Sequence, residues 1–299
     1  MGFKVWFLET RPHFLILSLT LVPIGTALAY YHGYFNPLNF ALALVGLVLL
    51  HVSVNVLNDY FDYKYGIDLQ TSRTPFSGGS GFLPAGALNP SAVYRLGVFA
   101  FLGGALIGVY FLITVGLILL PIIILGAVFV CLYTSHLVRL KGVAEVSAGL
   151  GLGALPVLGA YLVQTGFYSL EVALVSIPSG ILTFNLLLLN EFPDVEADRK
   201  GGRKHLVVLL GRRAASKLYA ALALTVYAWI LVCVLLGLTS PFLLLCFATF
   251  PLAFKAAKTA LKECEELRGL MPALGLNVLV VLITQTLLAV SYLAAALAA

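Results

Sequence analysis

The sequence predicts an all-α integral membrane protein, a bundle of about nine transmembrane helices, and three observations lead to this fold class. Hydrophobic residues make up 61% of the 299 residues, and charged residues only 10%, against roughly 25% in an average soluble domain. The mean hydropathy is +1.03. The apolar residues are grouped into segments of about 20, the length that crosses a bilayer. This composition excludes an ordinary soluble domain, a disordered chain and a fibrous protein.

Nine apolar segments are long enough to be predicted as membrane spans. They run over about 13–31, 38–57, 92–115, 116–133, 143–165, 169–190, 214–238, 241–258 and 272–296. Within the first segment, Ala27-Leu28-Ala29 resembles a signal-peptide cleavage site. Eight further apolar segments follow it, which favours a span. We therefore expect one polytopic membrane domain over residues 1–299.

All 18 Lys and Arg residues fall on one side of the predicted membrane. They lie before the first span and around the connections that follow the second, fourth, sixth and eighth spans. The positive-inside rule makes this side cytoplasmic, so we expect the N-terminus inside and the C-terminus outside a cell membrane. Of the 13 acidic residues, only Glu171 lies on the outer side. The net charge of +5 is therefore a topology signal, and no nucleic-acid partner is expected.

Function is expected at the cytoplasmic face, because the outer connections are short and almost uncharged. Two long inner loops, 58–91 and 191–213, carry acidic motifs. Loops positioned by a rigid scaffold are frequent locations of functional residues.

The first acidic motif lies where the second span reaches its inner end. At 100° per residue, Asn55, Asn58, Asp59 and Asp62 fall within about 100° of the helix circumference. One helix face therefore presents two carboxylates and two amides. Asp68 follows Gly66, where we expect the helix to have ended.

The second acidic motif, at the inner end of the sixth span, contains Asn190, Glu191, Asp194 and Asp198. Asp194 and Asp198 are four residues apart, and we expect them on one helix face with the other two on or beside it. The pattern Asn-acid-aromatic-x-Asp occurs at 58–62 and again from 190 to 194. This match predicts two four-helix pseudo-repeats followed by one additional helix.

Two facing groups of carboxylates predict a magnesium cluster. Like charges on one helix face repel each other, and near a membrane they also cost desolvation. Mg²⁺ offsets both effects and binds one or two carboxylates together with phosphate oxygens of a substrate. The candidate metal ligands are Asp59, Asp62, Asp68, Asn190, Glu191, Asp194 and Asp198, and the candidate catalytic residues are Asn55, Asn58, Asp59, Asp62, Asp68, Asp194 and Asp198. A solvated helix end is the alternative for either motif alone, but two motifs in matching positions favour the metal.

Cations on the same side of the membrane predict a site for a diphosphate. The candidates are Arg11, Arg73, Tyr133, Arg139, Lys141, Arg199 and Lys200. A topology signal is the alternative for each cation. The stretch Ser-Gly-Gly-Ser-Gly at 77–81 is either a backbone cradle for an anion or a flexible connector, and both interpretations stay open.

At these residues the sequence resembles the UbiA superfamily of intramembrane prenyltransferases, over essentially the whole chain. The first motif of the family, Asn-x-x-x-Asp with a third acid, is matched by Asn58, Asp62 and Asp68. Its second motif, Asp-x-x-x-Asp, is matched by Asp194 and Asp198.

The ending Tyr-Gly-Ile-Asp at 65–68 is similar to the menaquinone branch of the family, the 1,4-dihydroxy-2-naphthoate polyprenyltransferases. The ubiquinone branch would have its third acid at position 66, which is Gly66 here. Arg11-Pro12, Tyr133-Thr134 and the run 206–211 also resemble the menaquinone branch.

The resemblance implies Mg²⁺-dependent transfer of a prenyl group from a prenyl diphosphate to a lipid-soluble aromatic acceptor, in menaquinone biosynthesis. The implied partners are these two substrates and membrane lipids. The chemistry of the residues agrees, because a departing diphosphate needs its charge neutralised. An apolar chamber also keeps water away from a carbocation-like fragment.

Two alternative functions stay open. An archaeal-type ether-lipid prenyltransferase would act on a glycerol phosphate lipid, and the seven Lys and Arg residues in 199–217 suit a second phosphate. An ion-coupled transporter belongs to a different class and would carry its charged residues near the bilayer midplane. Here the charges lie at one face, which favours the enzyme.

Overall fold

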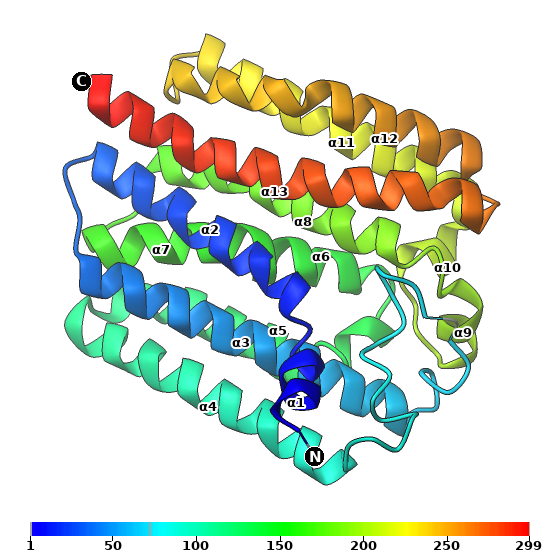
Figure 1. Ribbon diagram of the computed structural model, residues 1–299. Helices are drawn as coiled ribbons and strands as arrows, with labels where there is room; N and C mark the ends of the chain where they lie inside the picture. The colour runs from blue at the N-terminus through cyan, green and yellow to red at the C-terminus, as the bar shows by residue number, and fades with distance from the viewer. Residues whose placement is uncertain (1, 72, 299) are drawn as a thin grey trace.

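Apolar helices run the length of the structure, a computed structural model that describes residues 2–71 and 73–298 (Figure 1). The α-helices are α1 (Phe3–Glu9), α2 (Pro12–Tyr31), α3 (Pro37–Lys64), α4 (Pro90–Thr114), α5 (Leu120–Leu132), α6 (Val143–Gly149), α7 (Leu155–Thr165), α8 (Leu170–Asn190), α9 (Val195–Lys200), α10 (Leu206–Leu210), α11 (Arg212–Leu235), α12 (Phe250–Glu263) and α13 (Leu267–Ala298). Short 3₁₀ segments at Leu117–Leu119, Leu137–Arg139 and Pro241–Thr249 precede α5, α6 and α12. A π-helical segment, Leu150–Ala154, joins α6 to α7. The described residues contain no β-strand.

Eight helices are long and apolar enough to cross a membrane, which confirms the predicted helical membrane protein. Six of them are α2, α3, α4, α8, α11 and α13, and the other two are the composite helices Val143–Thr165 and Pro241–Glu263. The predicted fourth span forms a shorter apolar helix, Leu117–Leu132, that packs against α3, α4 and α7. The exact number of crossings, the inward N-terminus and the internal repeat stay predictions.

Polar caps fix where several of the long helices begin. Asn36 Oδ1 accepts a hydrogen bond from the backbone N–H of Leu38 (2.9 Å) at the start of α3. Asn89 Oδ1 accepts one from Ser91 N–H (2.9 Å) at the start of α4. Pro follows each Asn at the first helical position, where its missing N–H costs nothing.

Glycines allow the inner helices to approach closely. A Cβ atom on Gly25 of α2 would lie 2.1 Å from the carbonyl oxygen of Val157 in α7. A Cβ atom on Gly153 would lie 2.8 Å from the Cα of Gly180 in α8. Small residues at helix contacts are typical of membrane bundles, where lipid provides no hydrophobic force between helices.

The predicted span 143–165 is confirmed as an apolar helix long enough to cross a membrane, but the helix is irregular in its middle. Leu152 departs from helical geometry, with φ −120° and ψ 27°. Three glycines alternate with other residues between positions 149 and 153, and they weaken the helix because glycine loses the most backbone entropy on ordering. Gly151 and Leu152 line an internal cavity, so the irregular turn shapes that cavity.

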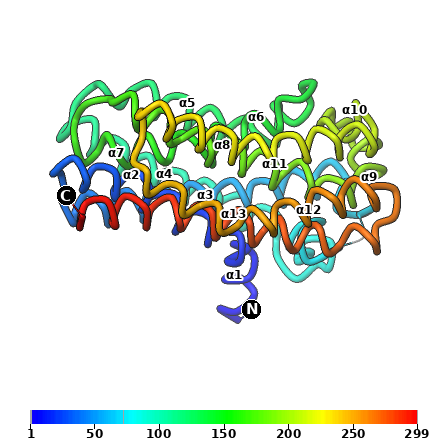
Figure 2. Tube along the Cα trace, turned by 90° about the horizontal axis from the view of Figure 1, so that it is seen from above, coloured from blue at the N-terminus to red at the C-terminus, as the bar shows by residue number. Residues whose placement is uncertain are grey.

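The C-terminal ends of α3 and α8 lie at the same end of the bundle. Figure 1 shows α9, α10 and the loop after α3 gathered at this end. In Figure 2, α1 projects from one side of the bundle and leads into α2. Segments that are far apart in sequence are therefore gathered at the end of the bundle where α3 and α8 end.

We expect Gly25→Ala to destabilise the bundle, because its new methyl group would collide with the backbone of α7. Overpacking of this kind typically costs about 1–3 kcal/mol. Thermal unfolding of the purified protein in detergent should therefore show a lower Tm. Gly126→Ala on α5 is the matched control, since no atom lies within 4 Å of its new methyl group. Equal Tm values for the two variants would contradict the close packing of α2 on α7.

Candidate active site

A cavity of about 260 Å³ lies between the two acidic motifs and extends into the bundle. Its polar lining residues include Arg11, Asn55, Asn58, Asp62, Asp68, Tyr133, Asn190, Glu191, Asp194, Asp198, Arg203 and His205. These residues come from α3, α8, α9 and the connecting segments. The fold therefore brings both sequence motifs to one space.

The cavity is elongated and changes character along α3. Residues of α3 line it from Leu47 to Asp62, a distance of about 22 Å at 1.5 Å rise per residue. The lining begins with leucine and ends with amide and carboxylate side chains. Phe14 and Phe129 add aromatic walls. A molecule with an apolar chain matches this arrangement, and an anionic head would need Arg11, Arg203 or a bound cation to offset the carboxylates.

In the first motif, Asn58 and Asp62 face the cavity from the last two turns of α3. The helix ends at Lys64, and Gly66 adopts φ +74°, which confirms the predicted helix end before Asp68. Asp62 accepts a hydrogen bond from Ile67 N–H (2.9 Å) through its carbonyl oxygen. This turn returns the Asp68 side chain to the cavity.

Asp59 does not line the cavity. It is buried, forms an ion pair with Arg11 and accepts a hydrogen bond from Ser80 N–H (2.9 Å). The hydroxyl of Ser80 donates to Glu9 (2.6 Å). These contacts fix the junction of α1 and α2 to the loop after α3. The assignment of Asp59 as a metal ligand stays a prediction.

The glycine-rich stretch 77–81 is a structured loop at the edge of the cavity. Gly78, Gly79 and Gly81 adopt positive φ angles of +86°, +68° and +78°, which L side chains rarely adopt. Ser77, Gly78 and Gly79 line the cavity. The Nε of Arg73 donates to the carbonyl oxygen of Gly79 (3.3 Å). The loop therefore has fixed contacts with its neighbours.

The second motif is divided between two helices, which corrects the expectation of one face. Asn190 is the last residue of α8, and Asp194 precedes α9. Pro193 has no N–H for a helical hydrogen bond, so the helix stops before it. Asp198 N–H donates to the carbonyl oxygen of Asp194 (2.9 Å), which preserves the spacing of these two acids.

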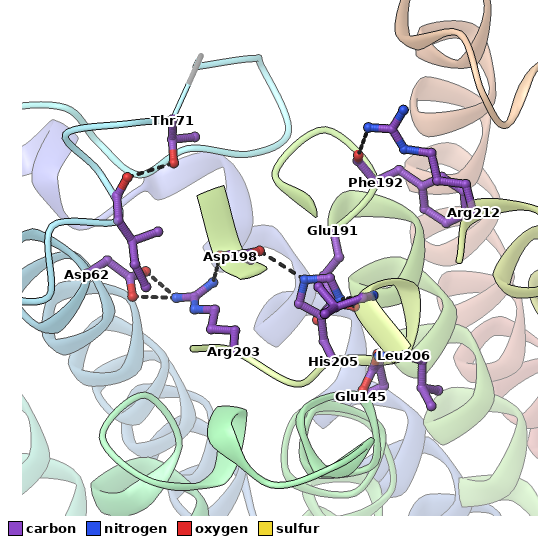
Figure 3. A network of polar contacts seen from close by, with 12 residues as sticks. Asp62, Thr71, Glu145, Glu191, Phe192, Asp198, Arg203, His205, Leu206 and Arg212 are labelled. Carbon is purple, nitrogen blue, oxygen red and sulfur yellow. Dashed lines mark hydrogen bonds and ion pairs between the residues drawn. The ribbon is translucent and has the colours of Figure 1, made fainter. Parts of the chain in front are cut away.

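Arg203 links the two motifs, and the sequence analysis did not select it. Its guanidinium forms an ion pair with Asp62, and its Nη1 lies 3.1 Å from Asp198 Oδ1 (Figure 3). Gly202 adopts φ +79° and turns the chain back, so that Arg203 N–H donates to the carbonyl oxygen of Asp198 (2.9 Å). Burial alone would lower the pKa of Arg203, but Asp62 and Asp198 outweigh it and raise that pKa.

The other cations predicted to bind diphosphate, apart from Arg11, do not line the cavity. These residues are Arg73, Arg139, Lys141, Arg199 and Lys200. Arg199 pairs with Glu196 (3.3 Å) on the exposed side of α9, and Arg139 lies over the Tyr65 ring, 4.2 Å from its centroid. Tyr133 lines the cavity. The roles of the five cations stay predictions.

Burial raises the pKa of three acidic groups that lie outside the membrane spans. Burial and the Asp198 carboxylate raise the pKa of Asp194 to about 7. Burial and the Asp62 carboxylate raise the pKa of Asp68 to about 6. Burial, followed by Glu145, raises the pKa of Glu191 well above its usual value. An added cation would favour the ionised forms of all three.

The donor atoms of the second motif fit magnesium. Asn190 Oδ1 and Asp194 Oδ1 are buried and accept no hydrogen bond within the described part of the chain. Both are hard oxygen donors, and the carboxylates of Asp62 and Asp68 line the same cavity, with Asp62 already paired with Arg203. Mg²⁺ prefers such donors. The observed residues can therefore hold this ion beside an anionic ligand.

Comparison with known proteins identifies the family. Residues 18–271 match the UbiA prenyltransferase family. The chain is 31% identical to a Bacillus subtilis 1,4-dihydroxy-2-naphthoate octaprenyltransferase over 86% of its own length and 82% of the relative. It is 30% identical to human UbiA prenyltransferase domain-containing protein 1, over 74% of this chain and 65% of that protein.

The fold also matches solved structures. A UbiA homolog from Archaeoglobus fulgidus bound to GPP and Mg²⁺ superposes with a TM-score of 0.64 at 11% identity, over 97% of this chain and 99% of that one. A UbiA homolog from Aeropyrum pernix gives a TM-score of 0.66 at 18% identity, over 90% and 95%. The resemblance found in the sequence is confirmed: the chain is a prenyltransferase and belongs to the UbiA prenyltransferase family.

Proposed function

We propose that this prenyltransferase transfers a prenyl group from a prenyl diphosphate to a lipid-soluble aromatic acceptor, with Mg²⁺, in menaquinone biosynthesis. One observation carries the proposal: carboxylates of both motifs meet at one end of an elongated cavity whose other end is apolar. The names of the naphthoate octaprenyltransferase relatives support the aromatic acceptor. We place the site at the cytoplasmic face of the cell membrane, on the side that carries the Lys and Arg residues.

Residues of both motifs would hold the metal. They are Asn58, Asp62 and Asp68 from the first motif and Asn190, Asp194 and Asp198 from the second. When bound, Mg²⁺ supplies Lewis-acid stabilisation of the diphosphate charge that develops as the C–O bond breaks.

Arg11 and Arg203 are the guanidinium groups that we assign to the diphosphate. Both line the cavity, and the buried Nε of each has no hydrogen-bond partner among the described residues. Charge-assisted hydrogen bonds to departing oxygens strengthen as negative charge develops, and they therefore stabilise the transition state more than the ground state.

The apolar part of the cavity orients the prenyl chain and excludes water. Leu47, Leu50 and Val54 line this part along α3. The aromatic faces of Phe14 and Phe129 can stabilise an allylic cation. The electron pair of the C–O bond leaves with diphosphate, and an aromatic carbon of the acceptor then attacks. The acceptor restores aromaticity by losing a proton, or CO₂ if that carbon carries a carboxylate.

A glycerol phosphate acceptor is less well supported. It would require cations for a second phosphate, but Arg199, Lys200 and Lys204 are exposed and do not line the cavity. Two of the bacterial relatives are named 1,4-dihydroxy-2-naphthoate octaprenyltransferases. We therefore favour the aromatic acceptor. Product analysis by mass, with a panel of quinone precursors and lipid acceptors, tests this choice.

Asp194→Asn should abolish Mg²⁺-dependent transfer, because it removes a charged ligand of the proposed cluster. We expect a loss of about 100-fold or more in turnover and loss of the Tm increase that Mg²⁺ gives the wild type. Glu196→Gln, an exposed position on α9, is the control.

In the wild type, Mg²⁺ affinity should rise from about pH 6 to pH 8, because Asp194 ionises near pH 7 and metal ligands must be deprotonated. Full turnover in EDTA would refute the proposed requirement for Mg²⁺.

Arg203→Ala should lose about 10²–10³-fold in turnover, and Lys141→Ala should stay near the wild type. Arg203 faces the cavity between the two motifs, whereas Lys141 is exposed and does not line it. Turnover and prenyl-diphosphate affinity are compared at equal membrane expression. A comparable loss in Lys141→Ala would instead support the assignment made from the sequence.

Cysteines placed at Gln70 and Tyr168 should react from opposite sides of the membrane. Both residues are exposed, and they lie at opposite ends of the bundle in the predicted topology. In intact cells, with Cys131 replaced, a membrane-impermeant maleimide should label position 168 only. Permeabilised cells should label both. Labelling of position 70 in intact cells would place the site on the outer face.

A further inference from the structure

Beside the cavity, three buried side chains from separate segments converge. Glu145 belongs to α6, Glu191 follows α8, and His205 precedes α10. One potential ligand atom from each residue lies within 4.8 Å of the other two. The exposed fractions are 0%, 7% and 1%. Figure 3 shows the three side chains grouped apart from the Asp62–Arg203 pair. We propose that they form a further metal site, suited to Zn²⁺.

Two carboxylate oxygens in this group point to a cation. Glu145 accepts a hydrogen bond from Leu206 N–H through Oε1, but its Oε2 is buried and has no partner among the described residues. The same holds for Glu191 Oε2. Arg203 does not compensate them by direct contact, because it pairs with Asp62 and Asp198. Two buried carboxylates at this spacing repel each other when both are ionised, so either a proton shared between Glu145 and Glu191 or a bound cation must relieve the repulsion.

The imidazole of His205 is oriented as a metal ligand. Its Nε2 lies 3.1 Å from Asp198 Oδ2, and Val208 N–H donates to its Nδ1 (3.4 Å). These two contacts together require the proton on Nε2 and a lone pair on Nδ1. Glu191 Oε2 lies 3.5 Å from Nδ1, and a cation between these two atoms would take the single Nδ1 lone pair in place of the long Val208 N–H contact (3.4 Å). A histidine that binds metal through one nitrogen usually donates its other N–H to a carboxylate.

The ligand atoms of this group indicate which metal ion the site would bind. One imidazole nitrogen and two carboxylate oxygens suit Zn²⁺ and similar divalent ions, whereas Mg²⁺ prefers oxygen donors alone. Glu191 and His205 also line the cavity, so a fourth ligand can come from that side. The proposal assigns Glu191 to this site and leaves the Mg²⁺ cluster to the other acidic residues. It does not depend on the prenyl-transfer reaction.

Zinc binding by the full-length protein tests the site. The protein is purified in detergent, treated with chelator, held in millimolar Mg²⁺ and titrated with Zn²⁺, and bound zinc is counted by mass spectrometry. We compare the wild type with Glu145→Gln and His205→Gln. The wild type should bind one more equivalent of Zn²⁺ than either variant, or bind it at least about 100-fold more tightly.

Glu145→Gln is the sharper variant, because the amide oxygen of Gln can still accept from Leu206 N–H. Its Tm without zinc should show that the fold is retained, and only the wild type should gain stability when Zn²⁺ is added. Glu196→Gln is the matched control, since Glu196 is exposed and distant from the group. It should bind zinc like the wild type.

Cobalt substitution separates this site from cysteine binding. Co²⁺ in the wild type should give visible d–d bands without a thiolate charge-transfer band, and Glu145→Gln should lose them. Equal Zn²⁺ binding by the wild type and Glu145→Gln would overturn the proposal, as would a thiolate band. Absence of zinc binding to the wild type would also overturn it and would identify Glu145 and Glu191 as a pair that shares a proton.

Discussion

The balance of charge between Arg203 and two carboxylates determines how the reaction end of this bundle is built. Asp62 and Asp198 are 4% and 1% exposed, and neither would stay ionised so deep without a partner. Arg203 compensates both and connects α3 to α9. An isolated arginine at that depth would be equally unfavourable. The loop 201–205 is therefore held at the cavity by these ion pairs, together with backbone hydrogen bonds of Lys204 with Val138 and Gly142.

Close apolar packing, rather than ion pairing, shapes the rest of the cavity. Gly25 brings α2 so close to α7 that no side chain fits between them. The irregular turn at Leu150–Ala154, where Gly153 packs against Gly180 of α8, moves the backbone away from regular helical positions. Dense packing in one region and an irregular helix in the next leave a chamber inside a bundle of otherwise continuous helices.

Hydrophobicity and motif spacing were sufficient to predict the spans and the meeting of the two acidic motifs. They could not identify Arg203 among the cations of 199–204, because the choice depends on the positive φ of Gly202, which turns one guanidinium inward. They also missed Glu145 and His205, which approach the second motif only through the packing of α6 and α10. Hydropathy averages over a window, so it did not detect the break at Pro193 or the irregular turn around Leu152.

Arg11, which lines the cavity, is held in a strained backbone conformation. Arg11 is the only non-glycine residue with positive φ in the described ranges, at +53°, and such a conformation costs about 1–3 kcal/mol. It permits a sharp corner between α1 and α2, after which Pro12 starts the helix. The buried ion pair with Asp59 offsets this cost and keeps the guanidinium at the cavity wall. Asp59 also accepts a hydrogen bond from Ser80 N–H. The same buried carboxylate therefore holds both the Arg11 corner and the glycine-rich loop beside the cavity.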